Sequence, residues 1–317
     1  MRAARYMPVP PDAGEMPGAG LRADEGKVSA LLDRGKLVVL TGAGLSTACG
    51  IPDYRDREGR WKRVQPIDHQ DFLRSAGTRR RYWLRSFFGW PVVDRAVPGI
   101  GHRALAHFES LDRVALVVTQ NVDGLHQKAG SRGVLELHGA LAQVVCLACD
   151  RRHSRAMVQE WLGAANPGLA ATPIAAPDGD ADVADALADG FHVPDCPACG
   201  GLLKPDVVFF GDSVPRPRVD AVMAAIDAAP GLLVIGSSLM VYSGFRFVEH
   251  AHRRGKPVMA INQGRTRADH LLEAKVEQDC GEFLDALRQR LAQEGTAAPS
   301  RQRPKEVPVG RRLSGEA

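Results

Sequence analysis

A glycine-rich turn follows an apolar run near the start of the chain and has the residue types of a phosphate-binding loop. Residues 37–40 are apolar and lead directly into Gly42, Gly44, Ser46 and Thr47. Glycines let a backbone approach a pyrophosphate closely, and the N–H groups at a following helix start favour negative charge. The dehydrogenase fingerprint would have a third glycine where Thr47 stands. The turn therefore indicates a nucleotide site that differs from that of an ordinary dehydrogenase.

Two Cys-x-x-Cys knuckles carry the strongest metal-binding signal in the sequence. They are Cys146–Cys149 and Cys196–Cys199, and residues 150–195 separate them. Four thiolates in two such pairs suit a tetrahedral Zn²⁺, whereas a redox motif would need only one pair. Because cysteines would fill all four positions, we expect one structural zinc ion per chain.

Three aspartates between the knuckles, Asp178, Asp180 and Asp182, have the alternation of a calcium loop. Such a loop needs a glycine at the position that Val183 occupies here. We therefore do not expect a calcium site in this segment.

The elements that would position these groups follow a β-α alternation. Four apolar runs end in polar turns, at residues 36–40, 114–118, 232–235 and 257–261, and helical stretches at 219–229 and 244–254 lie between later runs. Runs of this kind are typical of parallel strands buried on both faces. The pattern predicts an α/β fold with a doubly wound, parallel, Rossmann-like sheet, in which ligands bind at the carboxyl ends of the strands.

Two segments interrupt this alternation, and both ends of the chain differ from its body. Residues 57–98 are rich in arginine and aromatics and predict a helical insertion, while residues 141–204 hold the knuckles and predict a smaller zinc-binding lobe. Residues 1–25 and 295–317 are rich in proline, glycine or arginine and lack apolar periodicity, which predicts disordered tails. The catalytic domain would then span residues 26–294.

Composition narrows the class of partner. The chain has 317 residues, 44% of them hydrophobic and 25% charged, and a formal net charge of +4. Residues 297–317 supply five basic and two acidic residues, so the body is close to neutral. A nucleic-acid reader would carry a basic face on its folded part, and no apolar run approaches the roughly 20 residues that span a bilayer. We expect a cytoplasmic monomer that binds neither nucleic acid nor membrane.

The motifs together resemble those of the sirtuins, the NAD-dependent protein-lysine deacylases. They follow that family's order over about residues 35–285: GAGLSTACGIPDYRD (42–56), TQNVDGLH (119–126), LELHG (135–139), both knuckles, KPDVVFFGD (204–212), GSSLMVYS (236–243) and INQG (261–264). The segment RRRYWLRSFFGWP (79–91) and the insertion containing APDGD are most similar to the class II branch, which includes mitochondrial sirtuin-4. Thr47, the misfit to a dehydrogenase, is what a sirtuin carries.

The resemblance implies where NAD would bind. The first loop would cradle the pyrophosphate, residues 51–62 would cover the nicotinamide ribose, the loop at 120–123 would line the nicotinamide end, and later loops would hold the adenosine half. The residues so implied are Gly42, Ala43, Gly44, Ser46, Thr47, Ile51, Pro52, Asp53, Tyr54, Arg55, Trp61, Gln120, Asn121, Val122, Asp123, Gly236, Ser237, Ser238, Asn262, Gln263, Gly264 and Cys280.

The resemblance also implies the chemistry. The acyl-lysine carbonyl oxygen would attack C1′ of the nicotinamide ribose, and free lysine, nicotinamide and O-acyl-ADP-ribose would be the products. His138 would be the general base, and Asn121 and Asp123 would supply polar contacts at the reacting end. The same site implies one alternative activity, mono-ADP-ribosyl transfer to protein.

Two segments would bind the acylated protein. Val207, Phe209, Phe210 and Gly211 belong to an extended stretch that could pair with a substrate backbone and form an apolar tunnel. On a helix, Tyr82 and Arg85 would lie one turn apart, and a similar pair in some sirtuins meets acidic acyl groups. We therefore hypothesise faster removal of acidic or long acyl groups than of acetyl, with a surface-exposed Arg85 as the alternative.

Two other functional classes remain as rivals. A dehydrogenase with a zinc lobe would need the missing third glycine. A zinc module that binds nucleic acid or protein without catalysis would not release nicotinamide from NAD, so that assay separates it from an enzyme.

Overall fold

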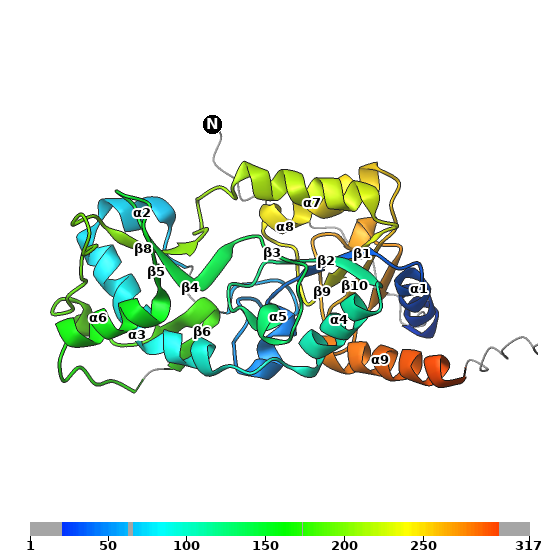
Figure 1. Cartoon of the computed structure of the whole chain (residues 1–317), viewed down its shortest axis with the longest axis horizontal. Coiled ribbons are helices and arrows are strands. Elements are labelled where there is room, and N and C mark those ends of the chain that lie inside the picture. Colours follow the sequence, from blue (N-terminus) through cyan, green and yellow to red (C-terminus); the bar gives the residue numbers. More distant parts are fainter. Residues whose placement is uncertain (1–20, 63–65, 173, 298–317) are drawn as a thin grey trace, which may run out of the picture.

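The structure, a computed structural model, describes residues 21–62, 66–172 and 174–297 and arranges them in two lobes (Figure 1). The larger lobe contains a six-stranded sheet with helices on both faces. The smaller lobe contains the knuckles and the segment rich in arginine and aromatics. Residues 1–20 and 298–317, most of the two predicted tails, lie outside the described residues.

The large sheet is parallel throughout and confirms the predicted fold class. Its strands lie in the order β11-β10-β9-β1-β2-β3. This is the 3-2-1-4-5-6 order of dinucleotide-binding folds, whose ligands bind where the order reverses. The strands are β1 (Leu37–Thr41), β2 (Val114–Thr119), β3 (Val134–Glu136), β9 (Leu232–Ile235), β10 (Val258–Ile261) and β11 (Ala274–Val276). The reversal lies between β1 and β9.

Helices cover both faces of this sheet because its central strands are apolar on both sides. Residues of β1, β9 and β10 are buried almost without exception, and alternate ones belong to two separate hydrophobic clusters. One face packs against α1 (Leu21–Asp33), α4 (Ile100–Ser110) and α9 (Cys280–Ala297). The other packs against α7 (Arg216–Ala228) and α8 (Tyr242–Arg253), at the top of Figure 1.

The smaller lobe is built on an antiparallel sheet of β4 (Gly139–Cys146), β5 (Arg152–Ser154) and β8 (Leu203–Val207). Helix α6 (Arg155–Ala165) and the hairpin of β6 (Ile174–Ala176) and β7 (Asp180–Asp182) belong to the same lobe. Helices α2 (His69–Arg74) and α3 (Ala76–Arg95) complete it. Short turns form the remaining elements: α5 (Leu125–Lys128), η1 (Ala43–Leu45), η2 (Thr47–Cys49), η3 (Pro177–Gly179), η4 (Asp185–Ala188) and η5 (Asp269–Leu271).

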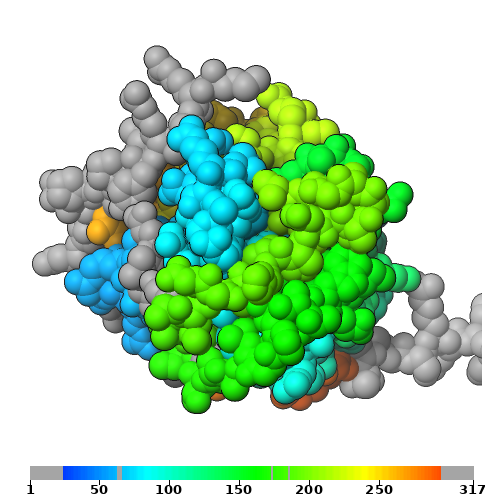
Figure 2. Space-filling model, turned by 90° about the vertical axis from the view of Figure 1, so that its left-hand side faces the viewer, coloured from blue at the N-terminus to red at the C-terminus, as the bar shows by residue number. Residues whose placement is uncertain are grey.

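The predicted helical insertion and zinc lobe share one core. Trp83 of α3, with no exposed surface, packs in one cluster with Val144 of β4, Leu162 of α6 and Leu203 of β8. Figure 2 shows the cyan α2–α3 segment and the green residues of the knuckle region side by side on this end of the molecule. The sequence predicted the helical insertion and the zinc-binding lobe as separate units, because they lie far apart in the chain. Side-chain packing joins them into one core.

Three predicted boundaries differ from the structure. The first helix begins at Leu21, so residues 21–25 are part of the fold rather than of a tail. Helix α9 continues to Ala297, beyond the predicted end of the domain at 294. The helical insertion begins at His69, whereas the stretch before it includes a bridge between Arg55 and Trp61. Local composition is ambiguous at each of these limits.

Within the described ranges, no helix combines the length and apolar character needed to cross a membrane.

Candidate active site

A cavity of about 1040 Å³ lies between the two lobes, at the carboxyl ends of the parallel strands. The four polar turns predicted to share a site all line it: residues 42–44 after β1, 120–121 after β2, 236–238 after β9 and 262–263 after β10. A cavity of this size at the reversal of strand order suits a dinucleotide. The structure thus brings four loops from distant parts of the sequence to one site.

The glycines of the first loop are required by contact with the loop after β9. A Cβ on Gly42 would lie 2.8 Å from the Gly236 carbonyl oxygen, and one on Gly44 would lie 3.0 Å from Gly236 Cα and oxygen. Gly236 itself has φ +61°, and its Cβ would lie 2.5 Å from the Leu45 nitrogen. Any side chain at these positions would separate β1 and β9 at the point where a ligand must enter.

The expected α-helix after the first loop is absent. Two 3-10 turns, η1 and η2, follow it instead. The N–H of Gly44 donates to the Gly236 carbonyl at 2.9 Å, and the N–H of Leu45 donates to the Gly42 carbonyl at 3.1 Å. The loop is therefore held mainly by its own backbone, and the contribution expected from a helix dipole is small.

A buried polar network supports the wall of the cavity from behind. Asn121 Nδ2 donates to the Gly42 carbonyl at 3.1 Å and to Ser46 Oγ at 3.0 Å, and Ser46 Oγ donates to Asp123 Oδ2 at 2.7 Å. Asn121 lines the cavity, while Ser46 and Asp123 lie behind it. The network fixes the first loop relative to the loop after β2, so the three side chains act as a unit.

His138 is oriented as a base. Its Nδ1 donates to the Gln120 carbonyl at 2.9 Å, which leaves the lone pair on Nε2 facing the cavity, where the Ser243 hydroxyl donates to it at 2.8 Å. Burial lowers the pKa of His138 to about 4, so the ring is neutral at neutral pH. A neutral imidazole with a fixed tautomer can accept a proton at Nε2.

Aromatic side chains join the predicted cofactor-covering stretch to the predicted substrate segment. The Tyr54 ring lies 5.8 Å from that of Trp61 and 6.0 Å from that of Phe210, and Trp61 lies 5.6 Å from Phe210. The Arg55 guanidinium lies 4.0 Å from the Trp61 ring, and Lys62 pairs with Asp53. The contacts with Phe210 join residues 51–62 to the segment after β8, and the other contacts hold the stretch together internally.

Most of the NAD-contacting residues implied by the sirtuin resemblance line the cavity. In chain order they are Gly42, Ala43, Gly44, Thr47, Pro52, Asp53, Tyr54, Arg55, Trp61, Gln120, Asn121, Gly236, Ser237, Ser238, Asn262, Gln263 and Cys280.

A few implied residues lie behind the cavity wall. Ile51 and Val122 are buried in a small hydrophobic cluster beneath the loop. Gly264 backs the cofactor-covering stretch, because a Cβ there would lie 2.3 Å from the Arg57 carbonyl oxygen. These residues shape the loops rather than the surface that a ligand would touch.

The predicted substrate segment is partly committed to internal contacts. The Val208 N–H donates to the His138 carbonyl at 2.8 Å, and the Phe210 carbonyl accepts from the His69 N–H at 2.8 Å. Phe209, Phe210 and Gly211 line the cavity, whereas Val207 packs between two hydrophobic clusters. The segment continues from the end of β8, forms an isolated bridge with Asp68 at Phe210 and turns at Gly211, and its pairing with a substrate backbone stays a prediction.

The placement of Tyr82 and Arg85 differs from the hypothesis. Both lie on α3, but neither lines the cavity. Tyr82 packs against Phe72 and Phe209, and burial raises its pKa. Arg85 donates from Nε and Nη2 to the two oxygens of Asp180, at 2.8 and 2.6 Å. In this structure Arg85 is therefore held by Asp180 outside the cavity lining, and the preference for acidic or long acyl groups stays a prediction.

Sequence reasoning missed several residues of the cavity wall. Asp178 reaches it from the insertion between the knuckles, and Ser243, Arg246 and Arg267 reach it from α8 and its surroundings. Ser243 belongs to the GSSLMVYS motif, so the resemblance to the sirtuins could have identified it. Asp178 gave no local signal, because its position depends on how the insertion folds back onto α3.

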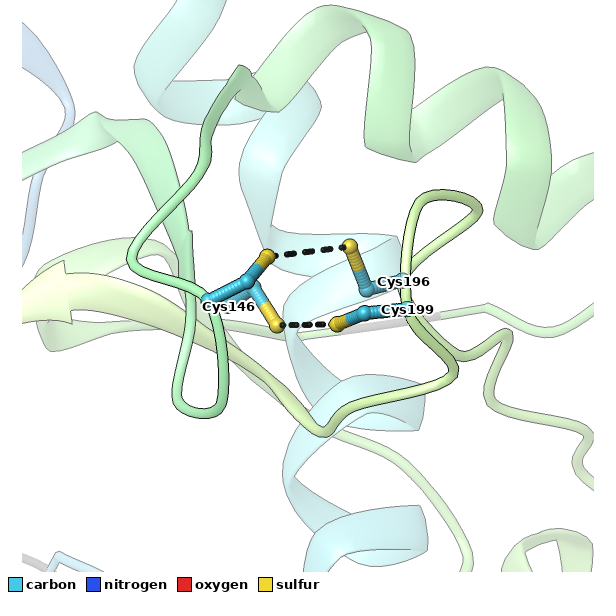
Figure 3. Close-up of side chains that lie close together, drawn as sticks. Cys146, Cys196 and Cys199 are labelled. Carbon is cyan, nitrogen blue, oxygen red and sulfur yellow. Dashed lines mark hydrogen bonds between the residues drawn. The ribbon is translucent and has the colours of Figure 1, made fainter.

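The four knuckle cysteines converge as predicted. Their sulfur atoms all lie within 4.8 Å of one another, with Cys146–Cys199 at 3.5 Å and Cys149–Cys196 at 3.9 Å (Figure 3). Zinc–sulfur bonds of about 2.3 Å in a tetrahedron place sulfurs about 3.8 Å apart. The donor set and spacing therefore fit one zinc ion, and four sulfurs leave no open position on it. In the segment between the knuckles, Asp178 accepts a hydrogen bond from Tyr54 and Asp180 pairs with Arg85.

Zinc should be required for folding. Replacing Cys196 with serine removes one of the four sulfurs, and we expect loss of the metal and a marked fall in melting temperature. Metal analysis should find one zinc per wild-type chain. Cys49→Ser, a half-buried cysteine outside the knuckles, is the matched control and should keep its zinc. A zinc-free wild type, or full stability in Cys196→Ser, would contradict the assignment.

Acid should destabilise the fold through two histidines. Burial lowers the pKa of His126 to about 3 and that of His138 to about 4, below the ordinary value of 6.5. The unfolded chain therefore binds more protons below about pH 6.5, and stability falls as pH falls. Between pH 7 and 5.5 we expect each histidine to cost about 1 kcal/mol. Urea unfolding of wild type and His126→Gln checks this, and an unchanged pH slope in the variant would refute it.

Comparison with known proteins gives close relatives. A family model described as the Sir2 family matches residues 42–243. An NAD-dependent protein deacetylase of Xanthomonas axonopodis pv. citri (strain 306) is 56% identical over 250 residues, covering 78% of this chain and 85% of that protein. The NAD-dependent protein deacylase Sirt4 of Drosophila melanogaster is 47% identical over 261 residues, covering 81% of this chain and 84% of its own.

Solved structures agree with the sequence comparison. A structure described as Sir2 with a p53 peptide and NAD⁺ has a TM-score of 0.65 and 29% identity, covering 86% of this chain and 98% of its own. Another, of Sir2 with an inhibitor, 2′-O-acetyl-ADP-ribose and deacetylated p53 peptide, has a TM-score of 0.66 and 28% identity, covering 86% and 100%. The family match contains His138, both knuckles and most of the cavity wall, and this chain therefore belongs to the Sir2 family, the sirtuins.

Proposed function

We propose that this chain is an NAD-dependent protein-lysine deacetylase. The observation that carries the proposal is the position of His138, whose Nε2 faces a cavity shared by the four loops at the strand ends. The names of the relatives from Xanthomonas axonopodis and Drosophila melanogaster point to the same reaction class. Acylated-lysine proteins or peptides would be the second substrate.

NAD, when bound, supplies the ribose carbon that receives the acyl oxygen. The chain's own residues would orient the reactants and move one proton. With the reactants bound, Nε2 of His138 would accept a hydrogen bond from one of their hydroxyls in place of the Ser243 hydroxyl, and would then take up that hydroxyl's proton. The backbone carbonyl of Gln120 holds Nδ1–H, so the ring stays in the tautomer that this step requires.

Exclusion of water is the second task of the site. The rings of Tyr54, Trp61 and Phe210 meet across the cavity and would cover the reacting end. Asn121, held by Gly42 and Ser46, would present a fixed polar surface beneath it. Fixed dipoles in a site shielded from water act more strongly than they would in solution.

The proposal extends to partners and location. We propose a monomer that works in the cytoplasm and binds neither nucleic acid nor membrane surfaces. The near-neutral charge of residues 1–296 supports the absence of nucleic-acid and membrane binding, since the formal charge of +4 comes mostly from residues 297–317. Light scattering of the purified protein would test the monomer, and a DNA-binding titration at low salt would test the absence of nucleic-acid binding.

The decisive experiment follows both products. The full chain is incubated with NAD and an acetyl-lysine peptide, and nicotinamide and deacetylated peptide are measured together. Equal amounts of the two, with O-acetyl-ADP-ribose, are expected. Nicotinamide release that depends on an acceptor protein, with ADP-ribose attached to it, would instead identify mono-ADP-ribosyl transfer. No nicotinamide release with any acyl peptide would reject an enzyme of this class.

His138→Ala should lower kcat for deacetylation by about a hundredfold or more, the scale of a general base. NAD binding and melting temperature should change little, because the ring lies at the cavity wall. His252→Ala, on the exposed face of α8, is the matched control and should keep wild-type turnover. Near-wild-type kcat in His138→Ala would show that another group is the base.

A further inference from the structure

The insertion between the knuckles reaches the cavity with the tip of a hairpin. Strands β6 and β7 are antiparallel, and the turn between them, η3, carries Asp178 into the cavity wall. There the Tyr54 hydroxyl donates a hydrogen bond to Asp178 Oδ2. This bond joins the small lobe to the stretch 51–62 that would cover the cofactor.

Helix α3 holds the hairpin tip in place. Arg85 binds both oxygens of Asp180, directly beyond the tip. Gly89, one helical turn further along, lies so close that a Cβ there would meet the Gly179 carbonyl oxygen at 2.3 Å. Ala181 is fully buried behind the tip. The tip is thus fixed by a charged pair and by direct contact of backbone with helix.

The backbone at the tip is itself constrained. Asp178 has φ 53° and ψ 42°, the left-handed region that non-glycine residues rarely adopt. Such a conformation persists only where the surroundings hold it, and it is concentrated at functional sites. Here it directs a carboxylate toward Tyr54 rather than toward solvent.

Tyr54 is well placed to transmit this contact to the cofactor stretch. Its ring packs edge-on against Trp61 and Phe210, and Trp61 in turn lies beneath Arg55. A hydrogen bond that fixes the Tyr54 hydroxyl therefore limits the movement of several neighbouring side chains of the cavity wall. Fixing a loop before its ligand arrives lowers the entropy cost of binding.

We propose that the hairpin tip is a latch that preorganises the cofactor-covering stretch for NAD. Asp178 is the positioning residue that holds Tyr54, and the Arg85–Asp180 pair holds Asp178 in place. This role rests on the proposed function, because NAD is the ligand concerned. In this proposal Arg85 acts by holding the hairpin tip through Asp180, and it need not touch the acyl group.

The test measures NAD binding directly, by calorimetry without acyl peptide, and then KM and kcat with an acetyl-lysine peptide. Asp178→Ala and Tyr54→Phe should each weaken NAD binding and raise its KM by about five- to tenfold, the net scale of one hydrogen bond. The loss should appear mainly in NAD affinity and in the KM for NAD, and less in the kcat at saturating NAD. Asp178→Asn, which keeps an acceptor and tolerates the left-handed region, should restore most of the affinity.

Controls separate the latch from a general loss of structure. The double variant Asp178→Ala/Tyr54→Phe should be no worse than either single variant, since both remove the same bond. Asp189→Ala removes an exposed carboxylate from the same insertion and should bind NAD like the wild type. Arg85→Met should also weaken NAD binding, and it should raise the KM for NAD more than it lowers kcat. Tyr54→Phe leaves the hairpin intact, so it decides the question even where Asp178→Ala folds poorly.

The outcomes distinguish two failures. Wild-type NAD affinity in Tyr54→Phe and in a folded Asp178→Ala would overturn the latch and leave the deacetylase proposal standing, and so would additive effects in the double variant. A wild-type chain that binds no NAD at all would overturn the proposed function and the latch with it.

Discussion

The close approach of two backbone loops at the centre of the sheet is the constraint on which the site depends. The turn after β1 and the turn after β9 touch through Gly42, Gly44 and Gly236, with no space for a side chain between them. This contact lies at the reversal of strand order, where helices leave the sheet on opposite faces and open a crevice. Every other loop of the cavity is placed relative to this pair.

The two lobes differ in size and packing, and they supply different parts of the cavity wall. The large lobe supplies the loops that would bind the dinucleotide, held by the dense apolar packing of its central strands. The small lobe has a smaller sheet and relies on the four converging thiols and on the Trp83 cluster. Its contribution to the site is positional: Phe209 and Phe210 from the segment after β8, and Asp178 from the insertion, all line the cavity between the lobes.

Polar groups held by fixed hydrogen bonds give the site its chemistry. His138 is kept uncharged by burial and kept in one tautomer by the Gln120 carbonyl, so its basic nitrogen is available without a proton having first to be lost. Asn121 and Asp123 are saturated by their neighbours, which makes them rigid. Rigid groups need little reorganisation when charge develops, and this is the largest advantage a protein site has over water.

The sequence by itself determined the fold class, the four strand-end loops and the zinc knuckles, because each is encoded by residues close together in the chain. The role of His138 followed only from the resemblance to the sirtuins. Apolar runs, turn glycines and Cys-x-x-Cys spacing are local signals that survive without tertiary information. Only the tertiary structure decided the partner of Arg85, the position of Asp178 and the shared core of the two insertions. Those depend on segments such as α3 and the β6–β7 hairpin meeting in space, and no periodicity or motif in either segment specifies the other.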